Sequence, residues 1–232
     1  MCYLYSVVVT LILVTTIYNV ITYQEQKRNR RIRIDTKNMA FKHHNKTTVK
    51  NTIVFLGDSI TEQFNVSEYF LNLPVINRGV SGNFTYEVLD RLNDVISLHP
   101  SKIILCIGTN DLSIKSNNVE DTLHNLIKIV DSLVSRMQST KLIVLPLFPI
   151  NTSKEPKIKR RYRKIAYYYK NRIATFNQLL LTEMSKKGIQ VIDMTEELVN
   201  HDGNLKLEYT TDGIHLTHQA YDIVYKQLIN NI

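Results

Sequence analysis

From Ile53 onward the chain alternates short apolar runs with longer stretches of helical period, and this alternation is the strongest constraint on its fold. The runs are rich in β-branched residues and apolar on both faces, as expected of parallel strands covered on both sides. They lie at residues 53–56, 75–76, 103–107, 142–147 and 189–192. Strands that alternate with helices require right-handed crossovers, so the sequence predicts an α/β fold with a doubly wound parallel sheet.

The stretches between these runs predict the helices that cover the sheet. Apolar residues recur in them with the period of an amphipathic helix. The predicted helices cover residues 60–71, 86–98, 119–138, 160–187 and 219–229. In a sheet of this kind ligands bind at the carboxyl ends of the strands, so the residues directly after each strand are the candidates for function.

The N-terminus has a different character from the rest of the chain. The first charged side chain is Glu25, and residues 2–23 are apolar and uncharged. A bilayer core of about 30 Å is crossed by a helix of about 20 such residues, and we expect residues 1–24 to be a retained transmembrane anchor. A cleaved signal peptide and a buried helix are the alternatives, but the basic start and small-residue cleavage site of a signal peptide are not clear. Tyrosines stand near both ends of the stretch, as interfacial aromatic residues do: Tyr3, Tyr5, Tyr18 and Tyr23.

The net charge of +8 comes from one segment. Residues 24–52 hold nine Lys or Arg against two acids, whereas the chain from residue 53 onward holds 20 basic and 19 acidic residues. We therefore expect a basic linker over residues 25–51 and a nearly neutral domain over residues 52–232. Because the excess charge belongs to the linker, it does not support a nucleic-acid partner. The basic flank of the apolar stretch favours a cytoplasmic domain.

Four polar turns, each bearing a glycine, are predicted to meet at one edge of the sheet. Gly57-Asp58-Ser59 follows the first strand, residues 77–82 follow the second, residues 108–111 follow the third, and residues 209–216 precede the last helix. Together they supply a hydroxyl, backbone amides, a side-chain amide, a carboxylate and an imidazole. These are the groups that acyl transfer needs.

Each of these groups has a predicted role. Ser59 is the candidate nucleophile, His215 the candidate general base, and Asp212 the carboxylate that orients the imidazole. The amides of Ser59 and Gly79, with the side-chain amide of Asn110, are expected to receive the oxyanion.

Taken singly, these residues have simpler interpretations. A lone Asp58-Ser59 is typical of a helix cap, and we expect Asp58 and Asp111 to be capping or turn residues. His218 competes with His215 as the base, and is expected to be a capping or exposed residue instead. Cys106 is expected to be a small buried apolar residue. The basic run at residues 157–164 is either a solvated surface or a contact for an anion.

The conjunction of the four turns resembles a known family. GDSIT, NRGVSG, GTND and DGIH occur in this order, as in the SGNH hydrolases, also called GDSL lipases or esterases. Ser59, Gly79, Asn110 and His215 match the four residues that give the family its name. The resemblance runs from about residue 53 to the end, and is closest to bacterial GDSL-like acylhydrolases and catalytic subunits of platelet-activating factor acetylhydrolase. It implies a three-layer α/β/α flavodoxin-like fold, a Ser-His-Asp mechanism, no metal and no other cofactor.

The sequence thus predicts a membrane-anchored serine esterase that cleaves a short acyl group or a lysophospholipid-like lipid ester through an acyl-enzyme. The alternative is a non-catalytic membrane-anchored module that binds an acylated glycan or lipid. Relatives with an N-terminal apolar segment are usually exported, which opposes the orientation that the basic flank favours. The side of the membrane, the acyl chain length, the leaving group and the oligomeric state stay open.

Overall fold

The computed structural model describes the backbone of residues 2–232, and their side chains except those of residues 2–4, 161 and 163–167. The chain divides into two compact units, Met1–Ala40 and Phe41–Ile232. Helix α1 (Cys2–Asn45) forms the described part of the first unit and ends within the second. The segment predicted to be a linker is therefore helical as far as Asn45, and the second compact unit begins at Phe41. Neither Gly nor Pro interrupts this segment, and Lys, Arg and Gln are good helix formers. The bounds of anchor, linker and hydrolase domain stay predictions.

The apolar part of α1 has the properties of a membrane span. From Tyr5 onward its mean hydropathy reaches 1.8, and none of this apolar stretch is buried. Signal sequences and core helices of soluble proteins also reach such lengths and compositions. The hydroxyls of its threonines donate to carbonyl oxygens three or four residues earlier, which satisfies these polar groups within the helix: Thr10, Thr15, Thr16 and Thr22.

The second unit is built on a sheet of five parallel strands in the order β2-β1-β3-β4-β5. In the register of the central strands, Gly57 at the end of β1 lies opposite Gly79 and Cys106. All of β1 is buried, because it has a strand on each side and helices over both faces. The strands are β1 (Ile53–Gly57), β2 (Val75–Gly79), β3 (Lys102–Cys106), β4 (Lys141–Val144) and β5 (Gln190–Val191). The predicted doubly wound parallel sheet is confirmed.

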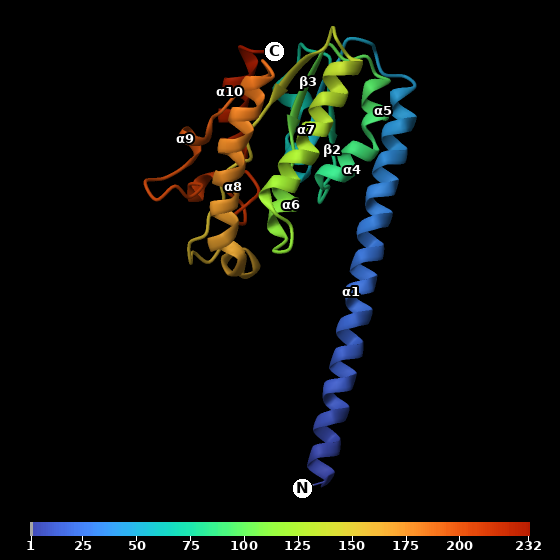
Figure 1. Ribbon diagram of the computed structural model, residues 1–232, viewed down its shortest axis with the longest axis vertical. Coiled ribbons are helices and arrows are strands. Elements are labelled where there is room, and N and C mark those ends of the chain that lie inside the picture. Colours follow the sequence, from blue (N-terminus) through green and yellow to red (C-terminus); the bar gives the residue numbers. More distant parts are fainter. Residues whose placement is uncertain (1) are drawn as a thin grey trace. The chain divides into compact units, whose positions relative to one another are not determined.

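Helices form a layer on each face of the sheet. One layer holds α2 (Ser59–Gln63), α3 (Val66–Tyr69) and α10 (His218–Ile229); in it the rings of Phe64 and Tyr221 stack with centroids 4.8 Å apart. In the other layer α7 packs against α4, α5, α6 and α8 (Figure 1). These helices are α4 (Thr85–Asp90), α5 (Leu92–Ile96), α6 (Thr109–Ser113), α7 (Val119–Arg136) and α8 (Arg160–Lys186). Helix α9 (Thr195–Leu198) and the 3-10 turn η1 (Leu207–Tyr209) lie between β5 and α10.

Two of the predicted helices are broken. The helix expected over residues 60–71 divides into α2 and α3, because the Asn77 side-chain amide donates to the carbonyl oxygens of Thr61 and Phe64 and so ends α2. The helix expected over residues 86–98 divides into α4 and α5 at Arg91, which has a non-helical backbone. The strand expected over residues 142–147 ends earlier, at Val144, two residues before Pro146, which lacks an amide hydrogen for the sheet.

Candidate active site

A tight turn carries the chain from β1 directly into α2 and makes Ser59 the first residue of that helix. The Asp58 side chain accepts a hydrogen bond from the Ile60 amide at 3.0 Å, which confirms its predicted role as a cap. Only glycine fits before it, because a Cβ on Gly57 would lie 2.2 Å from the carbonyl oxygen of Cys106. The turn therefore presents the Ser59 hydroxyl at the carboxyl edge of the sheet.

Asp58 itself is a buried carboxyl, with 1% of its surface exposed. Burial raises its pKa from 3.8 to about 7, although the Ile60 amide and the nearby His215 act in the opposite direction. The capping residue is thus a group that titrates near neutral pH.

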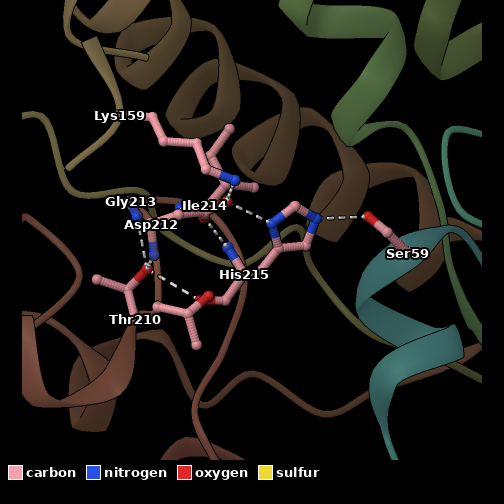
Figure 2. Close-up of polar contacts among 8 residues, drawn as sticks. Ser59, Lys159, Thr210, Asp212, Gly213, Ile214 and His215 are labelled. Carbon is pink, nitrogen blue, oxygen red and sulfur yellow. Dashed lines mark hydrogen bonds and ion pairs between the residues drawn. The ribbon is translucent and has the colours of Figure 1, made fainter. Parts of the chain in front are cut away.

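The structure brings Ser59, His215 and Asp212 into one line of hydrogen bonds (Figure 2). The distance from His215 Nε2 to Ser59 Oγ is 3.0 Å, and that from His215 Nδ1 to Asp212 Oδ2 is 2.9 Å. A carboxylate at Nδ1 keeps the imidazole proton on that nitrogen, so the lone pair of Nε2 faces the serine hydroxyl. This geometry suits proton transfer from Ser59 to His215.

The loop that carries Asp212 and His215 is held by its own hydrogen bonds. The Thr210 hydroxyl donates to the His215 carbonyl oxygen at 2.9 Å and accepts from the Gly213 amide at 2.8 Å. The amides of Ile214 and His215 donate to Asp212 Oδ1 at 3.1 and 3.0 Å. One carboxylate oxygen of Asp212 is therefore fixed by the backbone, and the other is directed at the imidazole.

The segment between β4 and α8 braces this loop from outside. The Asn151 amide donates to the Gly213 carbonyl oxygen at 2.7 Å, and the Lys159 amide to that of Asp212 at 3.0 Å. Lys159 Nζ lies 2.7 Å from Asp212 Oδ2, the same oxygen that faces His215 (Figure 2). In the sequence Lys159 was only one member of the basic run, and no local pattern links it to an aspartate 53 positions away. The side chains of residues 161, 163 and 164 of this run lie outside the described residues.

The surroundings of Asp212 keep it ionised. Burial alone would raise its pKa, but the hydrogen bonds from His215, Lys159 and two backbone amides outweigh burial and hold the pKa well below its usual range. A carboxylate at this position stabilises the imidazolium that forms when His215 takes a proton.

The predicted oxyanion donors do not all behave alike. The Asn110 side-chain amide donates to the Asn83 carbonyl oxygen at 2.9 Å, and a second amide hydrogen remains for an oxyanion. The Gly79 amide donates to Asn77 Oδ1 at 2.8 Å, so an oxyanion would have to displace Asn77. The structure leaves Gly79 a predicted donor, one that would exchange Asn77 for the oxyanion. It gives another reason for this glycine, because a Cβ there would lie 2.2 Å from the Glu62 amide nitrogen.

The remaining candidates have structural roles. Both carboxylate oxygens of Asp111 accept from the Thr85 amide, at 3.0 and 3.2 Å, which confirms Asp111 as a capping residue, here for α4. His218 is exposed at the start of α10, as expected. Cys106 is buried, and burial raises the pKa of its thiol. Among the described residues no three His, Cys, Asp or Glu side chains gather to hold a metal ion.

The parallel sheet and the Ser-His-Asp arrangement at its carboxyl edge have the form of a serine hydrolase. Residues 55–223 match the model of the GDSL-like Lipase/Acylhydrolase family, and the chain belongs to this family. Family membership implies hydrolysis of acyl esters at the level of the family.

Individual relatives agree with this assignment. The chain is 28% identical over 183 residues to platelet-activating factor acetylhydrolase IB subunit alpha2 of Rattus norvegicus, over 76% of this chain and 73% of the relative. A solved structure from Streptococcus pneumonia, provisionally described as a platelet activating factor, is similar with a TM-score of 0.79 and 26% identity, covering 91% of this chain and 98% of that one. A GDSL-like lipase of Bacteroides thetaiotaomicron shares the fold, with a TM-score of 0.73 and 23% identity. The match covers 83% of this chain and 95% of that one.

Proposed function

We propose that this protein is a serine esterase that cleaves a carboxylic ester through an acyl-enzyme formed on Ser59. The observation that carries the proposal is the 3.0 Å contact between Ser59 Oγ and an imidazole whose other nitrogen faces Asp212. A helix cap would need the serine alone, and a binding module would need neither the imidazole nor the carboxylate behind it.

In the proposed reaction His215 takes the Ser59 proton as Oγ attacks the ester carbonyl carbon. The carbonyl electron pair moves to oxygen, and we propose that this oxyanion is received by the amides of Ser59 and Gly79 and by the Asn110 side chain. The bond to the alcohol then breaks, and His215 gives the proton to the departing oxygen. Water, activated by His215 in turn, attacks the acyl-enzyme and releases the acid. Asp212 stabilises the imidazolium in both steps.

The proposed substrate carries a short acyl group or is a lipid ester of the lysophospholipid type. The similarity to a protein named as an acetylhydrolase supports a short acyl group, and an apolar helix beside the domain in the sequence supports a substrate at a lipid surface. We further propose that residues 1–24, which include the apolar part of α1, are retained as a single-span membrane anchor. Recovery of the full-length mass in carbonate-washed membranes is the expected result, and a mass lacking the first residues would contradict it. Protease treatment of intact and opened cells then determines the side of the domain.

The catalytic proposal is tested with the full-length protein in detergent micelles. Wild type is expected to react with a fluorophosphonate probe and to turn over p-nitrophenyl acetate, whereas Ser59→Ala and His215→Ala lose at least about 10³-fold in kcat. Ser67→Ala, which changes an exposed serine on α3, is the matched control and should behave as wild type. If Ser59→Ala reacts as wild type does, the esterase proposal fails and the binding module takes its place. A series of p-nitrophenyl esters then measures the preferred chain length.

A further inference from the structure

Arg91 is a buried cation that joins three segments at the carboxyl edge of the sheet. It lies between α4 and α5 with 6% of its surface exposed. Its Nη2 donates to the carbonyl oxygens of Gly57, at 3.3 Å, and Arg78, at 2.8 Å, and its Nε donates to Asn83 Oδ1 at 3.1 Å. One planar group therefore connects the ends of β1 and β2 with the loop after β2.

These acceptors lie next to the groups of the proposed reaction. Gly57 precedes Ser59 by two residues, and the carbonyl oxygen of Asn83 accepts from the Asn110 side chain at 2.9 Å. The position of Arg91 thus fixes the position of the Asn110 amide relative to the strand that carries the nucleophile. A guanidinium holds several acceptors in one fixed fork, whereas a lysine ammonium is a point charge on a flexible stem.

The last turn of α1 covers the buried pair of Arg78 and Arg91. The ring centroid of Phe41 lies 4.7 Å from the Arg78 guanidinium carbon and 5.9 Å from that of Arg91. Arg78 Nη2 donates to Asn45 Oδ1 at 2.6 Å, and Asn45 Nδ2 donates to the Asp94 carbonyl oxygen at 2.7 Å. Phe41 is itself buried, with 8% of its surface exposed.

This cover matters because two like charges lie together out of water. Burial lowers the pKa of both guanidinium groups, and the charge of Arg78 contributes further to lowering that of Arg91, to about 10. Both side chains therefore stay protonated at neutral pH and repel each other. The face of an aromatic ring and a side-chain amide oxygen stabilise such cations, and Phe41 and Asn45 supply them.

We propose that Arg91 is a positioning residue for the oxyanion side of the site, and that Phe41 and Asn45 hold the Arg78–Arg91 pair in place from the last turn of α1. The inference rests on the proposed esterase function. By this proposal the C-terminal end of α1, which the sequence predicts to be part of a linker, supports the active site.

The test uses Arg91→Lys in the full-length protein in detergent micelles, because this change keeps the charge and removes the fork. A misplaced oxyanion donor is expected to lower kcat for p-nitrophenyl acetate by roughly 10- to 100-fold, while KM changes by less than about threefold because ground-state binding is unaffected. Arg136→Lys, at an exposed arginine on α7, is the matched control and should leave both constants unchanged.

A double-mutant cycle with Asn110→Ala separates positioning from general loss of structure. If Arg91 acts through the Asn110 amide, Arg91→Lys lowers kcat by less than about threefold once that amide is gone, since residues that act as a unit are not additive. Equal effects in both backgrounds would overturn the proposal. So would a kcat within about twofold of wild type for Arg91→Lys alone.

Phe41→Leu tests the contribution of α1 and serves if Arg91→Lys does not fold. This change keeps an apolar side chain and removes the ring face, so kcat is expected to fall about threefold or more with KM unchanged. Met39→Leu, at a residue with 71% of its surface exposed, is the control. An unchanged kcat in Phe41→Leu overturns the role of α1. A wild-type chain without Ser59-dependent turnover would instead remove the proposed function itself, so the two failures are distinct.

Discussion

The buried carboxyl of Asp58 is predicted to make a contribution to the stability of the domain that is lost as pH rises from about 4 to 8. Below the ordinary pKa of 3.8 the folded and unfolded states are both protonated. Between pH 3.8 and about pH 7 the unfolded chain loses the Asp58 proton and the folded chain keeps it. The folded state then binds more protons than the unfolded state, so it loses stability as pH rises. Above about 7 both states are ionised, and the loss is complete.

The size of the effect is set by the difference between the two pKa values. A separation from 3.8 to about 7 corresponds to about 4 kcal/mol. Asp58→Asn removes the titration and keeps the cap, because Asn and Asp are equivalent N-cap residues. Relative to wild type, the variant is expected to gain almost nothing at pH 4 and about 4 kcal/mol at pH 8, which raises Tm by about 10 °C in a domain of this size.

The measurement is thermal unfolding of both full-length proteins in detergent micelles, monitored by near-UV circular dichroism at five pH values from about 4 to 8. All other titrating groups are common to both proteins, so the difference between the two curves isolates Asp58. Asp90→Asn, an exposed carboxylate on α4, controls for the loss of one negative charge. A Tm difference that stays constant over this range, or one that shrinks as pH rises, would refute the reasoning.

Two further predictions concern the edges of the site. Lys159→Met removes the cation 2.7 Å from Asp212 Oδ2, so that Asp212 stabilises the protonated imidazole more strongly. The acid limb of a profile of kcat/KM against pH should therefore move to higher pH. The shift should be less than about one pH unit, because the lysine is half exposed. An unchanged limb, or one at lower pH, would contradict this. Gly79→Ala places a Cβ 2.2 Å from the Glu62 amide nitrogen and is expected to destabilise the domain by more than about 2 kcal/mol in urea unfolding. Gly188→Ala, where no atom lies within 4 Å but φ is +66°, should cost only about 1 kcal/mol, and equal effects of the two changes would count against the packing explanation.

Local sequence patterns predict the sheet and the order of its turns well. A buried strand followed by Gly57-Asp58-Ser59 is a short-range signal, and the Asp212 to His215 spacing is contained in one loop. Parallel strands bring such turns to the same edge, which is why Ser59 and His215 are found together. The exact ends of helices were harder to predict, since the end of α2 depends on Asn77, a residue of another element.

Contacts between distant segments have no comparable signal. Lys159 is recognised in the sequence only as one positive charge among several, and its partner Asp212 is set by how the segment after β4 folds back. Arg91 similarly stands in an ordinary amphipathic stretch, and its three acceptors come from three other positions. For Gly79 the motif identifies the glycine but not its close approach to the Glu62 amide nitrogen, which is a contact with another element.

The pairing of Ser59 with His215 joins positions 156 residues apart, and this has a consequence for biosynthesis. The proposed nucleophile is translated directly after the first strand of the domain, at the start of α2, whereas its base follows 156 residues later. The imidazole is placed by a loop that rests on the segments around β4. A nascent chain that ends before residue 215 therefore contains no assembled site. Hydrolytic capacity is thus gained in one late step, and a product that ends before residue 215 carries the serine turn without its base.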